Sequence, residues 1–115
     1  MTLQGKIWGE TTEFFRNPMV SAHYLNIKKG GYCSEHKHTH KYNIFFVISG
    51  ILKITIWRDE KLKDITVLTD NQTTAVPPGF WHYFEALKDT KAIEIYQVIL
   101  EDPDIERRTQ GGIRK

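Results

Sequence analysis

Hydrophobic positions along the chain fall into short stretches rich in Val, Ile, Thr, Tyr, Phe and Trp. Turn signals such as Asn17-Pro18, Ser49-Gly50 and Pro77 to Gly79 separate these stretches. No window carries apolar residues at the 3.6-residue spacing of a helix over the length of a helix. Short strands separated by turns are typical of a β-sandwich or a β-barrel. The sequence therefore predicts an all-β fold, with strands at 20–27, 42–48, 51–57, 65–68, 73–76 and 92–100.

The strand expected at 42–48 is apolar on both faces. With the two-residue period of a strand, Phe45 and Val47 share one face with Asn43, and the other face carries Ile44, Phe46 and Ile48. A strand of this kind is covered on both sides. We expect one face to look into a barrel and the other to pack on a second layer or a partner subunit. A core strand in a plain sandwich explains the pattern equally well.

Because the second apolar face of the strand at 42–48 needs a cover, we expect the chain to associate with a partner. Two-fold dimers are the commonest closed oligomers, so we expect a homodimer. The N-terminal segment is a candidate interface strand because it carries Ile7, Trp8, Phe14 and Phe15.

Composition narrows the class of protein. The chain has 115 residues, a formal net charge of +2, 40% hydrophobic residues and one cysteine. This fits a single domain over residues 1–115, with 101–115 as a peripheral polar tail, and it argues against disorder and against a disulfide scaffold. We expect no nucleic-acid partner, because 16 Lys and Arg are spread among 14 Asp and Glu. No apolar run is long enough to span a bilayer and the N-terminus lacks a signal-peptide core, so we expect no membrane partner and a cytoplasmic location.

Three of the five histidines occupy alternate positions, His36, His38 and His40. On a strand they would point to one face. A fourth, His82, follows the stretch from Pro77 to Trp81. Imidazole is a good ligand for Zn, Cu, Fe and Ni, so the pattern predicts a metal site. A histidine-rich surface strand and a hydrogen-bonded polar pocket are the alternative interpretations.

Strand geometry limits which of these histidines can share an ion. Residues two apart on a strand are separated by about 6.6 Å, and residues four apart by about 13 Å. Bonds from zinc to imidazole nitrogen are about 2.1 Å long, so the ligand atoms must lie close together. The pairs that remain are His36 with His38 and His38 with His40, and His38 belongs to both.

The same residues resemble the two motifs of the cupin superfamily. The first runs Gly, five residues, His-x-His, three or four residues, Glu, six residues, Gly, and residues 30–50 match this spacing with Asn43 at the Glu position. The second runs Gly, five residues, Pro-x-Gly, two residues, His, three residues, Asn, and residues 71–86 follow it with His82 as the histidine. The residues at the motif positions are Gly30, His36, His38, Asn43, Gly50, Asn71, Pro77, Gly79, His82 and Ala86. Of these, Asn43, Asn71 and Ala86 stand where the motifs have Glu, Gly and Asn.

This resemblance implies a cupin jelly-roll β-barrel of two packed antiparallel sheets with a divalent transition metal near one mouth. The metal would be Zn, Fe, Mn or Ni, and the first ligand set is His36, His38 and His82. His40 is an alternate ligand or a catalytic general base. Because Asn43 replaces the usual carboxylate, the ion would keep its full charge and favour anionic ligands.

A substrate pocket is expected beside the metal. We assign Asn43, Phe45, Trp81 and Gln97 to it, because apolar walls with a few polar groups are typical of small-molecule sites. Packing in the core explains each aromatic residue equally well. Gln97 alternates with neighbouring isoleucines, which we expect to face inward. By the same alternation Cys33 should face away from the histidines.

The end of the chain, from Ile93-Glu94-Ile95 to Asp104-Ile105-Glu106-Arg107, resembles the cupin domain of bifunctional mannose-6-phosphate isomerases. The leading hypothesis is therefore a metal-binding cupin that acts on a small polar ligand, sugar-like or a sugar phosphate, as an isomerase. An Fe(II)-dependent dioxygenase and a non-catalytic ligand-binding cupin are the alternatives.

Overall fold

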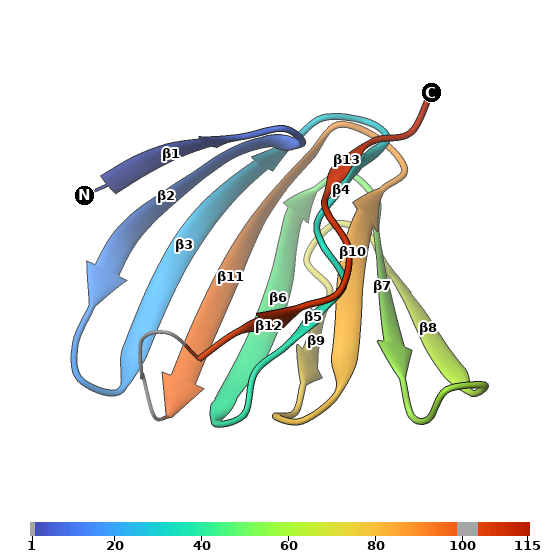
Figure 1. The fold of residues 1–115 in the computed structure, drawn as a ribbon. Helices are drawn as coiled ribbons and strands as arrows, with labels where there is room; N and C mark the ends of the chain where they lie inside the picture. Colours follow the sequence, from blue (N-terminus) through green and yellow to red (C-terminus); the bar gives the residue numbers. More distant parts are fainter. Residues whose placement is uncertain (1, 99–103) are drawn as a thin grey trace.

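The computed structural model describes residues 2–98 and 104–115, which fold into β-strands joined by turns and short loops (Figure 1). The strands are β1 (Thr2–Lys6), β2 (Gly9–Arg16), β3 (Val20–Ile27), β4 (Gly31–Tyr32), β5 (His36–Lys37), β6 (Lys41–Ser49), β7 (Leu52–Trp57), β8 (Lys63–Leu68), β9 (Thr73–Val76), β10 (Trp81–Ala86), β11 (Thr90–Val98), β12 (Glu106–Arg107) and β13 (Gly112–Ile113). Within these residues there is no helix, so the all-β prediction is confirmed.

The strands form two antiparallel sheets. The first has the order β1-β2-β3-β11-β6-β9. In the second, β10 lies centrally, with β5 and β4 on one side and β7 followed by β8 on the other, while β12 and β13 extend the edge beyond β5 and β4. The two packed sheets of the predicted jelly roll are confirmed, although the sheets do not close into a continuous barrel.

The hydrophobic core fills the space between the sheets. On β6 the inward face carries Asn43, Phe45 and Val47, which are buried, while Ile44 and Phe46 are only partly covered. The core residues in the described part of the chain are Trp8, Leu25, Ile27, Cys33, Phe45, Val47, Leu52, Ile54, Ile56, Leu68, Val76, Phe84, Ala86 and Ala92. Trp8 is 8% exposed and packs edge-on against Phe84, so it belongs to the core and not to an interface strand.

Two glycines fix the ends of the segment that carries the histidines. Gly30 has φ +81 and Gly50 has φ +112, values that L side chains rarely adopt. A Cβ at Gly50 would lie 2.5 Å from Oγ1 of Thr90, and one at Gly30 would lie 2.4 Å from the carbonyl oxygen of Arg114. Both turns therefore require glycine.

The inward rows of three strands change from apolar to polar toward the same end of the molecule. Cross-strand pairing places Val47 opposite Ala92, Phe45 opposite Glu94 and Asn43 opposite Tyr96. On the facing sheet the row along β10 runs from Ala86 through Phe84 to His82. This is the lower end in Figure 1, where β6 and β10 begin and β11 ends. The interior between the sheets is thus apolar at one end and polar at the other.

The C-terminal segment is more closely integrated than a peripheral tail. β12 pairs with β5, and β13 pairs with β4. Asp104, just before β12, is 6% exposed. The expectation of a peripheral 101–115 therefore does not describe residues 104–113, and residues 101–103 lie outside the described part of the chain.

No helix of the described residues has the length and apolar composition needed to cross a membrane.

Candidate metal centre

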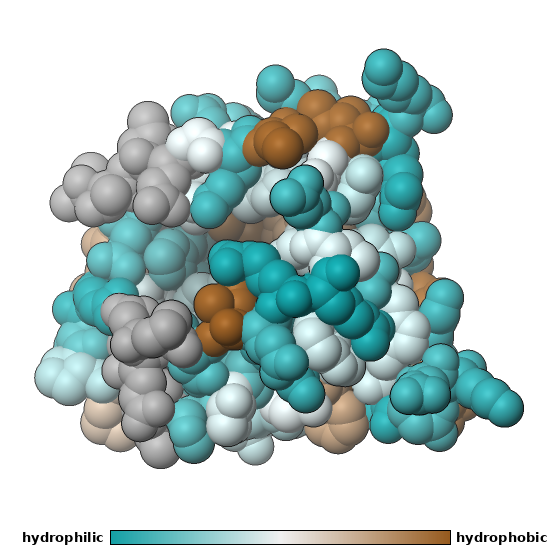
Figure 2. Space-filling model, in the orientation of Figure 1, coloured by the Kyte–Doolittle hydropathy of each residue, from teal (hydrophilic) through white to brown (hydrophobic). Residues whose placement is uncertain are grey.

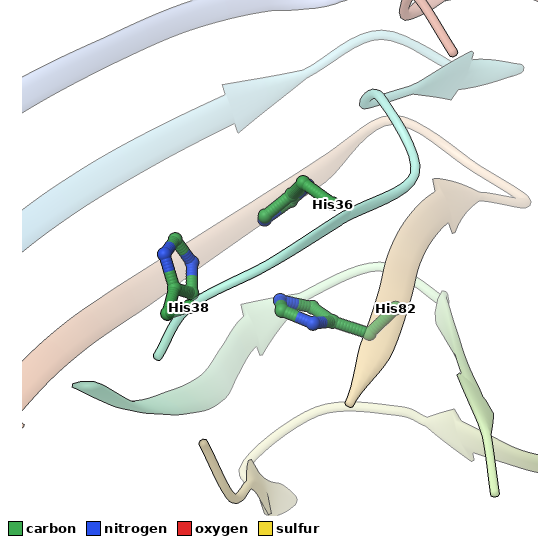
Figure 3. Close-up of side chains that lie close together, drawn as sticks. All are labelled: His36, His38 and His82. Atoms are coloured by element: carbon green, nitrogen blue, oxygen red, sulfur yellow. The ribbon is translucent and has the colours of Figure 1, made fainter. Parts of the chain in front are cut away.

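Three buried histidines from two segments of the chain converge at the polar end of the interior. His36 lies on β5, His38 follows one residue after that strand ends, and His82 lies on β10. Each offers a ring nitrogen, and these three atoms lie within 4.8 Å of one another. Figure 3 shows the three rings pointing toward a common space between the segments.

Backbone pairing brings the two segments together. His82 lies directly opposite His36 in the antiparallel pairing of β10 with β5. Residues paired in this way project to the same face, a few ångströms apart. Their ring centroids are 4.3 Å apart, and the His38 ring lies 5.1 Å from His36 and 5.5 Å from His82.

Each imidazole is oriented by a bond from its Nδ1 to a backbone carbonyl oxygen. His36 Nδ1 donates to the carbonyl of Ser34 at 2.7 Å, and His38 Nδ1 to that of Asp104 at 2.7 Å. His82 Nδ1 donates to the carbonyl of Phe80 at 3.0 Å. We assign the proton of each ring to Nδ1 from these partners, which leaves Nε2 as the nitrogen that can bind a metal. At His82 this Nε2 also lies within hydrogen-bond distance of Asn43 Nδ2, which donates to it. Bonds of this type hold metal-binding histidines in position.

The rings are neutral at ordinary pH. Burial, with the neighbouring His82, lowers the pKa of His36 to about 3. Burial also lowers the pKa of His82 to about 4, and it lowers the pKa of His38. Neutral imidazole is the form that binds a metal.

Two polar atoms of the site are buried without a hydrogen-bond partner among the described residues, His38 Nε2 and Asn43 Oδ1. Asn43 Nδ2 lies 3.2 Å from His82 Nε2, so this amide is beside the same cluster. Leaving such atoms unpaired costs about 1–3 kcal/mol each. A cation would provide the missing partner of His38 Nε2, and the amide oxygen of Asn43 is a further neutral ligand atom. These residues therefore fit a divalent transition metal.

A cavity of about 480 Å³ opens beside His36. Residues of β1 and β2, the inward face of the first sheet and the C-terminal segment line it: Lys6, Ile7, Trp8, Thr11, His23, Cys33, Ser34, His36, Phe84, Glu94, Tyr96, Ile105, Arg107, Thr109, Gln110 and Gly111. Figure 2 shows the face seen in Figure 1 as largely hydrophilic, with hydrophobic atoms near its centre and at its upper edge. The cavity therefore reaches the cluster at His36, whereas His38 and His82 are not among the residues that line it.

Glu94 is the functional candidate that sequence reasoning missed. It lines the cavity and is 7% exposed. Burial raises its pKa to about 7, although hydrogen bonds with the side chains of Asn43 and Tyr96 act in the opposite direction. Burial and the neighbouring Glu94 hold the pKa of Tyr96 well above its ordinary value. Cross-strand pairing is the signal that places Glu94 inside. Glu94 pairs with the inward Phe45, two residues from the inward Asn43, and paired residues project to the same face of the sheet.

Comparison with known families gives the same answer as the motifs. A family model described as "Cupin domain" matches residues 23–99. This chain belongs to the cupin family. A search of curated protein sequences found no match.

Solved structures similar to this cupin share its fold at low sequence identity. Oxalate decarboxylase from Bacillus subtilis matches with a TM-score of 0.81 at 14% identity, over 92% of this chain and 29% of that one. Capsular polysaccharide assembling protein CapF from Staphylococcus aureus matches with a TM-score of 0.77 at 23% identity, over 94% of this chain and 32% of that one. KdgF from Halomonas sp. matches with a TM-score of 0.73 at 16% identity, over 84% and 87%. The cupin thus spans about a third of the length of the first two proteins.

His40 lies outside the histidine cluster of this cupin. The turn after His38 leaves the residue exposed, and its backbone amide donates to Oδ2 of Asp104 at 2.9 Å. The same carboxylate accepts the Thr39 amide at 2.6 Å. Of the four histidines expected at the metal, the structure gathers His36, His38 and His82.

The expected pocket residues separate into different environments. Asn43 lies in the metal centre, whereas Phe45 is 1% exposed and sits in the core against Phe84. Trp81 alternates with the inward His82 and lies beneath Lys37 and Arg108, on the outer face of the second sheet. The assignment of Trp81 to the pocket is therefore wrong, because β10 turns it outward.

Gln97 and its isoleucine neighbours also have the opposite orientation to the prediction. Glu94 faces the interior and Tyr96 the cavity, while Ile93, Ile95 and Gln97 are only partly buried. Pairing with β6 and β3 sets this orientation. Gln97 is not among the residues that line the cavity.

The prediction that Cys33 faces away from the histidines is wrong. Cys33 and His36 line the same cavity, and Cys33 Sγ accepts the backbone amide of Phe84 at 3.2 Å. Residues 33–35 lie between β4 and β5 and are not in a strand, so alternation does not carry through them. Burial raises the pKa of the thiol, which favours an unreactive protonated form.

Proposed function

We propose that this cupin binds a divalent transition metal through His36, His38 and His82 and acts on a small polar ligand, sugar-like or a sugar phosphate, in the adjoining cavity. The observation that carries the proposal is the set of three buried imidazoles whose Nδ1 atoms are all bonded to backbone carbonyls. This arrangement presents three neutral Nε2 atoms to one point. When bound, the metal would supply Lewis-acid polarisation of a ligand oxygen.

Residues of the chain account for the other requirements of such a site. The three rings hold the ion, and the core below them excludes water from one side. Glu94 lines the cavity with Tyr96 and provides a buried carboxyl group that can accept a ligand hydroxyl proton or hydrogen bond. A sugar isomerisation needs a proton carrier of this kind, and Glu94 lies in the cavity whereas His40 is exposed.

Metal content tests the first part of the proposal. Purified protein incubated with Zn, Mn, Fe or Ni and then desalted should retain about one equivalent of metal by elemental analysis. His38→Ala should remove it, while His40→Ala, two residues along the same segment and exposed, should retain it. Circular dichroism checks that both variants are folded. Equal metal content in wild type and His38→Ala would contradict the site.

A phosphosugar panel then separates the functions. Turnover of an aldose or ketose phosphate by the metal-loaded protein supports the isomerase. Oxygen consumption with substrate by the iron-reconstituted protein supports the dioxygenase. The observation that favours this second function is that the metal group found in the described residues consists of three histidines without a carboxylate. Ligand-dependent stabilisation with no turnover supports a binding module.

The homodimer is a proposal of the same kind. Ile7, Phe14 and Phe15 are 69%, 44% and 50% exposed on the N-terminal strands or the turn between them, and a partner copy would cover such residues. Sedimentation at micromolar concentration should give the mass of two chains. A single-chain mass would exclude the homodimer.

A further inference from the structure

The short strand β12 places an arginine beside the histidine cluster. In the antiparallel pairing of β12 with β5, Arg107 lies directly opposite His36, and Glu106 lies opposite Lys37. Paired residues share a face, so Arg107 projects to the side that carries His36. The other pair lies on the outer face, where Lys37 Nζ is 3.5 Å from Oε2 of Glu106.

Arg107 also lines the cavity, and its guanidinium adds a positive charge to the lining. The positive charges that lower the pKa of Glu94, against the larger effect of burial, are those of Lys41 and Lys6. Lys6 lines the cavity from β1.

The lining therefore has an excess of positive charge. Lys6 and Arg107 are its lysine and arginine, and Glu94 is its acidic residue. A divalent ion at the cluster would add positive charge, because the three-histidine group contains no carboxylate to offset it. A small ligand that enters this cavity meets its most favourable electrostatic energy if it carries a negative charge.

We propose that Arg107 binds the anionic group, a carboxylate or a phosphate, of a sugar acid or sugar phosphate held in this cavity. The inference rests on the proposed function and names the residue that selects the ligand class. The guanidinium is suited to this role because its planar fork donates two parallel hydrogen bonds to carboxylate or phosphate oxygens. Since Arg107 is opposite His36, the anionic group would lie close to the metal centre.

The adjacent Arg108 provides a matched control. Its guanidinium lies on the outer face, with Nε 2.9 Å from Oε1 of Glu35 and the group stacked over Trp57 and Trp81. Arg107→Gln and Arg108→Gln remove the same charge one residue apart, on opposite sides of the second sheet. A difference between them reports a specific contact and not the net charge of the protein.

The experiment measures the affinity of the full chain for D-glucose 6-phosphate, D-glucuronate and D-glucose by calorimetry at constant ionic strength. Zinc-loaded and chelator-treated wild type, Arg107→Gln, Arg107→Lys and Arg108→Gln are compared. Wild type should bind at least one of the two anions more tightly than D-glucose. Arg107→Gln should raise the Kd for that anion about tenfold or more, Arg107→Lys should restore part of the affinity, and Arg108→Gln should leave it unchanged. The anion that responds identifies the group as carboxylate or phosphate.

Three results would overturn the assignment: no binding of either anion by wild type, equal affinities in wild type and Arg107→Gln, or equal losses in the two glutamine variants. Failure of the metal proposal is seen separately, as wild type that retains no zinc. Because the anion affinities are also measured without metal, the contribution of Arg107 is determined in either case.

Discussion

The metal-free protein should lose stability as the pH falls from about 6.5 to 4.5, because of its buried imidazoles. The pKa of His36 is about 3 and that of His82 about 4 in the folded chain, whereas both lie near 6.5 when unfolded. In this window the unfolded state takes up protons that the folded state does not. Stability therefore rises with pH by about 1.4 kcal/mol per pH unit for each histidine, and falls by the same amount on acidification.

Glu94 opposes this dependence. Its pKa is about 7 in the folded chain and near 4.5 when unfolded, so the folded state holds a proton that the unfolded state releases. Its contribution is fully present below pH 4.5 and is lost as the pH rises through 7. His36 and His82 acting against Glu94 leave a net loss of about 1.4 kcal/mol per unit, or about 3 kcal/mol between pH 6.5 and 4.5. His38, whose pKa burial also lowers, adds to the loss in the same direction.

Urea denaturation of chelator-treated protein at pH 4.5, 5.5 and 6.5 measures this loss through the free energy of unfolding. His82→Gln should flatten the pH dependence, because one of the titrating rings is gone. Glu94→Gln should steepen it, because the opposing group is gone. Stability that is constant over this window, or variants that both keep the wild-type slope, would refute the reasoning.

Three further changes test the packing and the support of the site. Phe84→Ala, at a core position 3% exposed, should lower the free energy of unfolding by about 3–5 kcal/mol in urea titrations. Gly50→Ala should lower it by about 1–3 kcal/mol, because φ is +112 and the new Cβ would meet Thr90, and wild-type stability would contradict this. Asp104→Ala should weaken zinc binding about tenfold in chelator competition, because its carboxylate holds the turn that follows His38, and unchanged affinity would count against that role.

The sequence predicted the histidine cluster, but it did not show that the row of alternate histidines at 36, 38 and 40 leaves the cluster after His38. Alternation and the cupin spacing correctly grouped His36 and His38 with His82. Nothing local distinguished His40 from its neighbours. The chain turns there because the carboxylate of Asp104, more than sixty residues away, accepts the backbone amides of Thr39 and His40. A long-range contact of this kind is invisible to a local pattern.

The orientation of β11 was mispredicted for a different reason. Its isoleucines were expected to face inward, on the same side of the strand as Gln97. The pairing with β6 turns Glu94 inward and leaves Ile93 and Ile95 on the partly covered outer face. Hydrophobicity alone fails here because both faces of this sheet are apolar, and only the register decides which face points to the cavity.

The amide of Asn43 and the carboxyl group of Glu94 depend on each other in the interior. The cupin resemblance implies a carboxylate at position 43, yet Asn43 is fully buried and hydrogen-bonded to Glu94. A second carboxylate at that position would put two like charges side by side in the interior, which would force one of them to hold a proton. With an amide there, the acid stands on the cavity wall, outside the three-histidine group. The metal would then keep its full charge, and the cavity would favour the anionic ligand that Arg107 is placed to bind.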